Sequence, residues 1–439
     1  MPDRSPVDVE AFRLPSMVHV TETGSRTQHL RDLSERAPLV WKFGGTSVAD
    51  HVRLRAVAER LVTAQRAGHE VVAVLSAMGT STDELSGLAY EVSARPPLRE
   101  LDALLSVGES ISCALASMAV AELGSRAVSL SGPQAGIRTD GNHGNARLND
   151  IDPRRIRQAL ADGAIVLVTG FQGMSASGDI TTLGRGGSDA SAVAVAAALG
   201  ARECDIFTDV PGVFTADPRI VPDARKLDSI RHEEMLEMAE AGAAVLQPRA
   251  VELAMTHGID LHLRSSFSTE IGTWIRHADG RFEGRGALDV AGIAHRRQEG
   301  LYGVTDVEVS EVAAALAERG IAIGAAVSRA GTLVEFTTPG VGAVETTAAL
   351  GAVEIPVRAN RDLGSVSVIS LGVGRRPDII ARTLAALREA DIPPHLVTTM
   401  PGRVSVLVDS DVVDGAVRTL HAAFIPVAPE SRLDVVPTA

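Results

Sequence analysis

Cysteine is scarce in this sequence: Cys113 and Cys204 are the only two among 439 residues. Both lie in apolar segments, which predicts buried free thiols and argues against a disulfide framework or a cysteine-ligated zinc site. Such sparing use of cysteine is typical of a reducing compartment, so we expect a cytoplasmic protein.

Aromatic residues and net positive charge are also scarce. Phe, Trp and Tyr make up 3% of the chain, and the formal net charge is -13. Proteins that bind nucleic acids present basic surfaces and stack bases on aromatic rings, so both features argue against a nucleic-acid partner. No apolar run approaches the ~20 residues of a transmembrane helix, and the first residues contain no apolar signal segment, so we expect no membrane contact. Small-molecule chemistry remains as the class of function.

The chain does contain a regular alternation of strand and helix patterns. From Pro38 onward, β-rich runs such as PLVWKF and EVVAVLSAM alternate with helical runs such as VRLRAVAERLVTAQRAG. This alternation predicts an α/β sandwich around a largely parallel central sheet, with ligands at the carboxyl ends of the strands. We assign residues 38–280 to this catalytic domain. Residues 1–37 are polar and lack an apolar period, so we expect a disordered extension there.

A second pattern follows the Gly- and charge-rich connection HADGRFEGRGALDVAG. It predicts two small α+β modules of ferredoxin-like type within residues 298–439, acting as ligand-sensing or dimerising units. The expected strands lie near Leu301 and over 332–338, 366–371 and 403–409, and the expected helices over 310–318, 377–390 and 412–424.

The segment WKFGGTSVAD places a cation beside a glycine turn. Lys42 ends the first expected strand, and Gly44, Gly45 and Thr46 lead into a helix. A lysine directly after a buried strand requires an anionic partner, and backbone N–H groups at a helix start bind anions, so phosphate is the expected ligand. The spacing differs from the P-loop, in which the lysine follows the glycines. The alternative is a glycine-rich turn with an incidental lysine.

A second glycine turn occurs in TTLGRGGSDASA, which places Arg185 and Asp189 on either side of a glycine pair. The glycines allow the backbone to approach a ligand, and the helix that follows adds the positive end of its dipole. The alternative is an ordinary strand-to-helix turn capped by Ser188, which leaves Arg185 and Asp189 unexplained.

Two further signals are weaker. The segment TDVPGVFTADPRI supplies Asp209, Phe214 and Arg219, which fit either a nucleotide-base pocket or an ordinary hairpin. The segment SVGESISCAL places Glu109 on a helix, where a lone glutamate is usually solvated.

Taken in order, six segments resemble the motifs of the aspartate kinases of the amino-acid kinase superfamily: KFGGTSV, GFQG, TTLGRGGSDASA, TDVPGVFTADPRIVPDARKLD, EEMLEMAEAGAAVL and LRSSFS. The resemblance runs from about Val40 to Ile275, and the modules after Leu301 look like the paired ACT domains that end such kinases, with weaker motifs. It implies ATP-dependent phosphorylation of the side-chain carboxylate of L-aspartate to 4-phospho-L-aspartate. It also implies ATP and Mg²⁺ as cofactors and a homodimer or higher homo-oligomer formed through the ACT-like modules.

The resemblance further implies a role for each matching residue. Lys42 stabilises the transferring phosphoryl group, and Arg185 binds the α-carboxylate of aspartate. The acids that hold the substrate ammonium are Asp189 and Glu109, the hydroxyls near substrate and phosphates are Thr46 and Ser76, and the nucleotide-binding positions are Gly44, Gly45, Asp209, Phe214 and Arg219. Aspartate's side chain is ionised near pH 7 and needs no general base. The resemblance implies Lys42 and Asp189 as the catalytic residues. No cluster of metal ligands is visible in the sequence, so we expect Mg²⁺ to be held mainly by the phosphates.

The sequence departs from the family pattern at three places. Ala244 stands where most relatives have a lysine that touches the ATP phosphates, and Arg249 is one candidate for a substitute cation. Ser110 replaces the arginine of a frequent Gly-Glu-Arg. In the first ACT-like module, the segment from Asp306 to Val309 lacks the family's D-x-P-G turn, and Ser328 with Arg329 replaces a Gln-Asn pair that contacts effectors.

These departures leave three functions open. The first is an active aspartate kinase with weakened lysine and threonine feedback, serving a specialised pathway. The second is a catalytically weak homologue that binds nucleotide or amino acid and regulates a partner protein. The third is a kinase for a related amino acid, with a pocket reshaped at Ser110. Retention of Lys42, Arg185, Asp189 and Glu109 favours the active enzyme, because drift in a non-catalytic protein has no reason to spare both ends of the substrate site.

Overall fold

The computed structural model describes residues 37–243, 245–277, 290–329, 332–341 and 343–425. Two features expected from the sequence, the extension before Ala37 and the position of Ala244, therefore lie outside the described residues.

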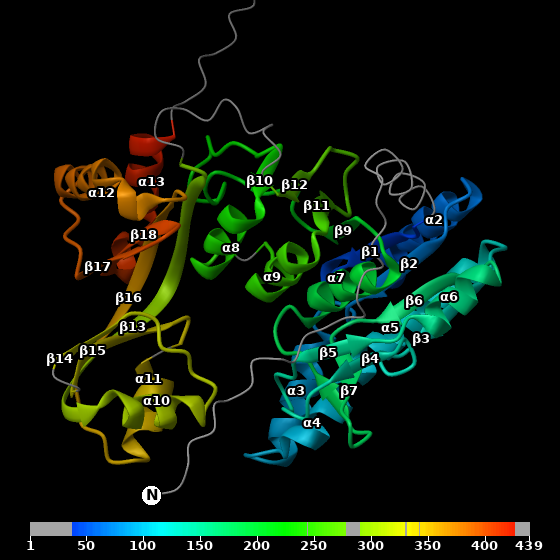
Figure 1. Cartoon of the computed structure of the whole chain (residues 1–439), viewed down its shortest axis with the longest axis horizontal. Coiled ribbons are helices and arrows are strands. Elements are labelled where there is room, and N and C mark those ends of the chain that lie inside the picture. Colours follow the sequence, from blue (N-terminus) through cyan, green and yellow to red (C-terminus); the bar gives the residue numbers. More distant parts are fainter. Residues whose placement is uncertain (1–36, 244, 278–289, 330–331, 342, 426–439) are drawn as a thin grey trace, which may run out of the picture. The chain divides into compact units, whose positions relative to one another are not determined.

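An eight-stranded sheet with the order β10-β12-β11-β9-β1-β2-β6-β3 forms the centre of the N-terminal part (Figure 1). Neighbouring strands are parallel except for β11 and β12, which confirms the largely parallel sheet. The strands β2 and β6 are apolar and buried along their whole length, as expected for strands covered on both faces. The strands are β1 (Leu39–Phe43), β2 (Val71–Leu75), β3 (Ala127–Leu130), β6 (Ile165–Thr169), β9 (Glu203–Thr208), β10 (Ser229–Arg231), β11 (Asp260–Ser265) and β12 (Thr273–Arg276).

Helices cover both faces of this sheet. Trp41 and Phe43 of β1 pack in one hydrophobic cluster with α2 and α5. Because side chains alternate along a strand, Lys42 faces the other side, where α7 contacts β1, β2 and β9. The helices are η1 (Gly45–Val48), α2 (His51–Arg66), α3 (Ser81–Val92), α4 (Leu98–Leu105), α5 (Val107–Glu122), α6 (Arg154–Ala161), α7 (Gly187–Leu199), α8 (His232–Glu240) and α9 (Pro248–His257).

A small four-stranded sheet with the order β5-β4-β7-β8 lies in the chain before α7. Its last strand leads directly into the glycine turn at Arg185, so this sheet positions that turn. The strands are β4 (Ile137–Thr139), β5 (Leu148–Ile151), β7 (Gln172–Met174) and β8 (Ile180–Thr182).

The C-terminal part contains the expected pair of α+β modules, but they share one six-stranded sheet with the order β14-β15-β13-β16-β18-β17. The expected helices and the strand over 403–409 are present, while the strand expected over 366–371 begins earlier, at Val357. The elements are β13 (Gly292–Glu308), α10 (Val309–Ala317), β14 (Ala326–Arg329), β15 (Thr332–Pro339), α11 (Ala343–Gly351), β16 (Val357–Ile369), η2 (Val373–Arg375), α12 (Pro377–Glu389), β17 (Leu396–Met400), β18 (Arg403–Asp409), η3 (Ser410–Val412) and α13 (Val413–Phe424).

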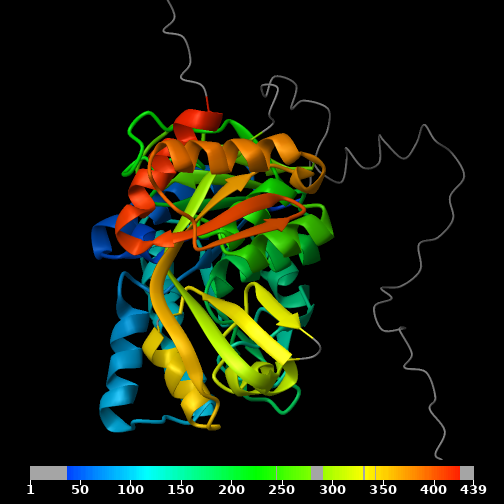
Figure 2. The same cartoon turned by 90° about the vertical axis from the view of Figure 1, so that its left-hand side faces the viewer.

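Two long antiparallel strands join the modules. The pairing of β13 with β16 runs from Gly292 opposite Ile369 to Val304 opposite Val357. Figure 2 shows both strands passing from one module into the other. The first module is therefore inserted in the chain between the first strand of the second module and that strand's partner.

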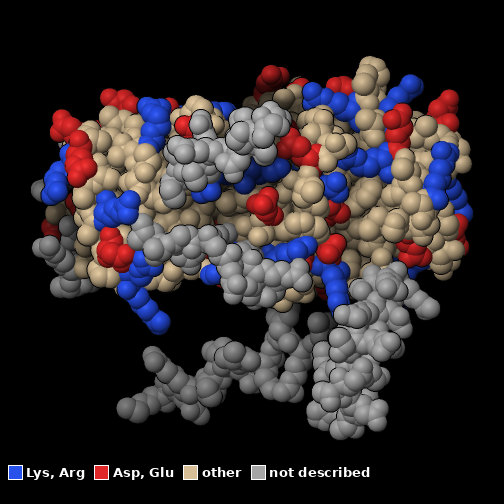
Figure 3. All heavy atoms as spheres, turned by 90° about the horizontal axis from the view of Figure 1, so that it is seen from above, with Lys and Arg blue, Asp and Glu red and all other residues tan. Residues whose placement is uncertain are grey.

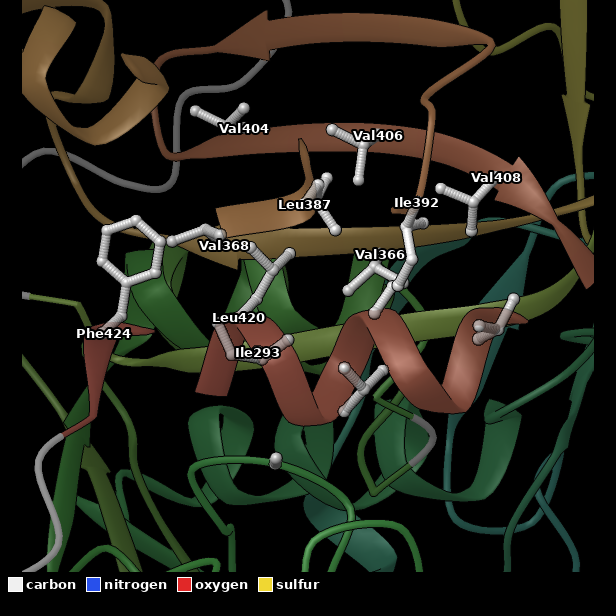
Figure 4. Close-up of a cluster of buried hydrophobic side chains, with 14 of the residues drawn as sticks. Ile293, Val366, Val368, Leu387, Ile392, Val404, Val406, Val408, Leu420 and Phe424 are labelled. Atoms are coloured by element: carbon white, nitrogen blue, oxygen red, sulfur yellow. The ribbon is translucent and has the colours of Figure 1, made fainter. Parts of the chain in front are cut away.

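The core of the second module is a cluster of branched aliphatic side chains from β13, β16, β18, α12 and α13 (Figure 4). Ala216, Ile220 and Val221, from the loop after β9, belong to the same cluster. Thr215 Oγ1 lies 2.9 Å from His421 Nε2, and Arg403 of β18 forms ion pairs with Glu237 and Glu240 of α8. The second module thus shares part of its core with the kinase part of the chain.

One helical stretch among the described residues, Leu98–Glu122, is long and apolar enough by composition to cross a membrane. Sequence inspection alone did not predict it, because charged residues interrupt the apolar run. Two of these, Asp102 and Glu109, are buried inside the protein, and α5 packs along α2 and β3. We therefore interpret the stretch as helices of the sandwich. Basic and acidic side chains are interspersed on the face drawn in Figure 3.

Candidate active site

A buried ion pair lies where β1 ends. Lys42 Nζ is 2.6 Å from Asp189 Oδ1 of α7, and about a tenth of each side chain is exposed. The alternation along β1 aims Lys42 at α7, and Asp189 lies in the first turn of that helix. The sequence-predicted cation and acid are therefore in direct contact. Interactions between charges are strong here because little water screens them.

The glycine turn after β1 passes close to the Lys42 ammonium. A Cβ on Gly44 would lie 3.4 Å from Lys42 Nζ, and a Cβ on Gly45 would lie 3.0 Å from Ala77 O. The turn is tied to the neighbouring strands because Gly44 N donates to Phe207 O and Ser76 N donates to Phe43 O. A side chain at Gly44 would fill the space beside the cation, and one at Gly45 would press on the turn after β2.

The hydroxyl positions differ in exposure. Thr46 is exposed, and its carbonyl accepts a 2.7 Å bond from Arg53 Nη1. Ser76 is partly buried after β2, and its carbonyl accepts from Ser112 Oγ at 2.7 Å. Both bonds involve the backbone carbonyls, and neither hydroxyl makes a hydrogen bond within the described part of the chain.

Glu109 is a buried carboxyl beneath the turn after β2. Its residue exposure is 3%, and Oε1 accepts from Ala77 N at 3.2 Å. Its other oxygen has no hydrogen-bond partner among the described residues. Desolvation raises the pKa of Glu109 to about 7, against the lowering effect of the Ala77 bond. The solvated glutamate considered for this position is therefore wrong.

The second glycine turn holds Arg185 outside the core. Gly186 has φ +71° and is the residue before α7, and no side chain caps that helix. Capping by Ser188 is therefore wrong, since Ser188 lies within the first turn. Arg185 is exposed, and the structure gives its guanidinium no hydrogen bond or ion pair within the described part of the chain. It remains available for an anion.

The nucleotide candidates lie on the loop that leaves the carboxyl end of β9. Asp209 is exposed and accepts a hydrogen bond from Thr208 Oγ1. Phe214 is half-buried, and its backbone forms an isolated β-bridge with that of Lys226. Arg219 is 88% exposed at its side chain and pairs with Asp217 at 2.7 Å, which lowers the pKa of Asp217. Among the described residues, these three candidates make no hydrogen bond or ion pair with the Lys42 turn, so their grouping with it rests on the pairing of β9 with β1.

Two residues change the account drawn from the sequence. Arg249, considered there as a substitute phosphate cation, donates to the carbonyls of Leu183 and Ala146. Asp102, which the sequence analysis missed, is buried and accepts from Thr182 Oγ1 at 2.5 Å and from His143 Nδ1 at 2.8 Å. Its signal was an acid at a core position of the amphipathic run LRELDALL.

The site thus combines two cations and two acids at the carboxyl end of a parallel sheet. Lys42 and Asp189 are in contact, Glu109 is buried under Ala77, and Arg185, at the start of α7, makes no ion pair within the described part of the chain. This set can bind a zwitterion at both ends and neutralise a phosphoryl group. Within the described residues, no cluster of three or more His, Cys, Asp or Glu side chains is arranged to hold a metal ion.

Comparison with known proteins places this chain in a family. Residues 37–265 match the model of the amino acid kinase family, and residues 366–424 match an ACT domain. The aspartokinase of Mycolicibacterium smegmatis is 46% identical, with 88% of this chain and 96% of the relative covered. The aspartokinase of Geobacillus stearothermophilus is 44% identical, with 88% and 97% covered.

Solved structures agree. E. coli aspartokinase III in complex with aspartate and ADP has the same fold, with a TM-score of 0.74 at 23% identity, over 89% of this chain and all of that one. Aspartate kinase from Synechocystis is 34% identical, with a TM-score of 0.51, over 90% of this chain and 70% of that one. The resemblance seen in the sequence is confirmed, and the chain belongs to the aspartokinases of the amino acid kinase family.

Proposed function

We propose that this protein transfers the γ-phosphoryl group of ATP to the side-chain carboxylate of L-aspartate, giving 4-phospho-L-aspartate and ADP. The observation that carries the proposal is the buried Lys42–Asp189 pair at the carboxyl end of the parallel sheet. A second buried carboxyl, that of Glu109, lies under the turn after β2. The aspartokinase relatives, and the aspartokinase III structure with aspartate and ADP, support the same substrates.

The substrate roles follow from charge and position. Arg185 binds the α-carboxylate in a two-pronged contact, which only a guanidinium offers. Asp189 and Glu109 select the ammonium. When substrate binds, its ammonium replaces Lys42 as the partner of Asp189, and Lys42 is released toward the transferring phosphoryl group. Because the attacking carboxylate is already ionised, positioning and charge neutralisation supply the catalysis, and no general base takes part.

ATP lies along the carboxyl ends of β1 and β9 in this proposal. The backbone of Gly44 and Gly45 approaches the phosphates, Thr46 and Ser76 supply hydroxyls, and the loop carrying Asp209, Phe214 and Arg219 surrounds the nucleoside. Mg²⁺ is held mainly by the phosphate oxygens in this proposal. When bound, the ion offsets negative charge on the phosphates.

The structure weighs on the two alternative functions. A non-catalytic regulatory homologue has no need for a buried ion pair and a buried carboxyl with an oxygen that lacks a partner among the described residues, because burying such groups is costly. A kinase for a related amino acid was suggested by Ser110. Its hydroxyl donates to Ser106 O of its own helix, and its side chain is exposed, so it gives no reason to alter the substrate.

The C-terminal modules are assigned a dimerising role with weakened feedback by lysine and threonine. The segment that replaces the family's D-x-P-G turn begins at Asp306, which adopts φ +56°. Ser328, at the position of the effector-contacting pair, lies on the edge strand β14. We assign residues 38–280 to catalysis and 298–439 to these modules, in a cytoplasmic homodimer or higher homo-oligomer. Two buried free thiols agree with the cytoplasm.

Trapping of the acyl phosphate tests the activity directly. Purified protein is incubated with ATP, Mg²⁺ and hydroxylamine and with aspartate, glutamate or asparagine in parallel. Aspartate hydroxamate is the expected product. Hydroxamate from glutamate alone would make the protein a kinase for a related amino acid. Binding of ATP with no hydroxamate from any amino acid would leave only the regulatory homologue.

A further inference from the structure

One guanidinium joins two segments that lead to the Arg185 turn. Arg249, in the first turn of α9, donates from Nη1 to Leu183 O at 2.9 Å and from Nη2 to Ala146 O at 2.7 Å. Leu183 is two residues before Arg185 in the chain. Ala146 belongs to the loop between β4 and β5, whose backbone also bonds to β8 because Ala146 N donates to Thr182 O.

A buried acid holds the other side of the same junction. Asp102 of α4 accepts from Gly144 N at 3.0 Å and from Thr182 Oγ1 at 2.5 Å. Asp102 and Arg249 thus each bond to both the 144–146 segment and the 182–183 segment, one through a carboxylate and one through a guanidinium. The two segments form one unit held from two helices.

Both neighbours of Arg185 are glycines, Gly184 packed against this unit and Gly186 against the start of α9. A Cβ on Gly184 would lie 3.0 Å from Asn145 Oδ1, and a Cβ on Gly186 would collide with the side chain of Gln247, the residue before α9. Both glycines have positive φ, +73° and +71°. A turn with two such glycines has little conformational preference of its own, so its neighbours determine where Arg185 lies.

We propose that Arg249 is a positioning residue for aspartate binding, which it serves by fixing the turn that presents Arg185. The inference rests on the proposed role of Arg185. Two carbonyls on different segments require two donors in a fixed fork, which arginine has and lysine lacks. This assignment replaces the substitute phosphate cation that the sequence suggested for Arg249.

The kinetic test compares Arg249→Ala and Arg249→Lys with Arg66→Ala. Arg66 also donates to a backbone carbonyl, Leu123 O at 2.7 Å, but at the far end of α2. In Arg249→Ala the KM for aspartate rises about tenfold or more, because a small displacement of a substrate-binding group is enough for that loss. Arg249→Lys shows a smaller rise in the KM for aspartate. In both variants the KM for ATP changes less than about twofold. Arg66→Ala changes neither constant. Equal rises in both KM values, or an unchanged KM for aspartate, would overturn the proposal.

A second measurement does not depend on activity. Amide hydrogen exchange of segments 144–147 and 183–187 is compared between the wild type, both Arg249 variants and Arg66→Ala. Faster exchange confined to these segments in the Arg249 variants supports positioning, and unchanged exchange there refutes it. If the wild type yields no hydroxamate, the proposed function fails while the exchange result still decides the role of Arg249. If Arg249→Ala does not fold, the lysine variant carries both comparisons.

Discussion

Replacing Glu109 by Gln should stabilise the protein at alkaline pH while weakening aspartate binding. The glutamine side chain has nearly the same shape, and its amide oxygen still accepts from Ala77 N. The substitution replaces the ionisable carboxyl group by a neutral amide. Glu109 is 3% exposed, so its charged form is poorly solvated in the folded protein.

The size and sign follow from the pKa of Glu109, which burial raises from 4.5 to about 7. Below pH 4.5 the carboxyl is neutral in both folded and unfolded protein and has no effect on stability. Above it, the folded protein keeps a proton that the unfolded chain loses, and the free energy of unfolding falls by about 1.4 kcal/mol per pH unit. Above pH 7 the loss levels off at about 3 kcal/mol. Glu109→Gln does not suffer this loss.

Urea unfolding of wild type and Glu109→Gln at several values between pH 5 and pH 8 measures the effect. The variant gains stability relative to wild type across this range, by about 2–3 kcal/mol in total. Glu84→Gln, on the exposed face of α3, is the matched control and shows no pH-dependent difference. In parallel, aspartate binds the wild type more tightly as pH rises through about 7, since only ionised Glu109 attracts the ammonium. A stability difference that is constant with pH would refute the buried carboxyl.

Four further predictions concern the site and its regulation. Arg185→Ala should raise the KM for aspartate about tenfold or more and leave the KM for ATP unchanged, and an unaltered aspartate KM in steady-state assays would contradict its role. Lys42→Met leaves Asp189 buried without its partner and should lower the free energy of unfolding by about 3–5 kcal/mol, and adding Asp189→Asn should recover part of this loss in the same denaturation assay. Lysine and threonine, titrated separately and together into the kinase assay, should inhibit weakly; strong inhibition at millimolar concentration would contradict the account of the Asp306 turn. Ala244→Lys should raise kcat/KM for ATP by about one to two decades, whereas a lower Tm with unchanged kcat/KM would show that no cation is missing.

Local sequence was enough to locate the charged groups of the site. Lys42 lies near the end of a β-rich run, between two aromatic residues that point to one face of the sheet. Alternation alone therefore places Lys42 on the other face. Asp189 follows a glycine pair at a helix start, and that helix packs on the same side of the sheet. The sequence thus locates both charged groups, while their contact depends on the face of the sheet on which α7 packs, which only the structure shows.

Features that depend on distant segments were not predictable in this way. The burial of Glu109 depends on Ala77. A Cβ placed on Gly108 would lie only 2.8 Å from the Cβ of Ala77, so it is this glycine that allows α5 to come close to the turn after β2. The anchoring roles of Asp102 and Arg249 depend on a loop that neither residue adjoins in the chain. Ser188 satisfied the composition of a helix cap, but the helix begins earlier, at Gly187, because the two preceding glycines with positive φ complete the turn before it.

The insertion of the first C-terminal module into the second has a consequence for synthesis on the ribosome. Ile293 in β13 pairs with Val368 in β16, 75 residues later in the chain. When β13 emerges, its end in the second module therefore has no partner, whereas its other end soon meets β15. The inserted module can fold first, and its completion brings β16 alongside the part of β13 that is still unpaired. The apolar loop residues Ala216, Ile220 and Val221 belong to this second core, so the kinase part of the chain reaches its final packing only after α13 has been synthesised.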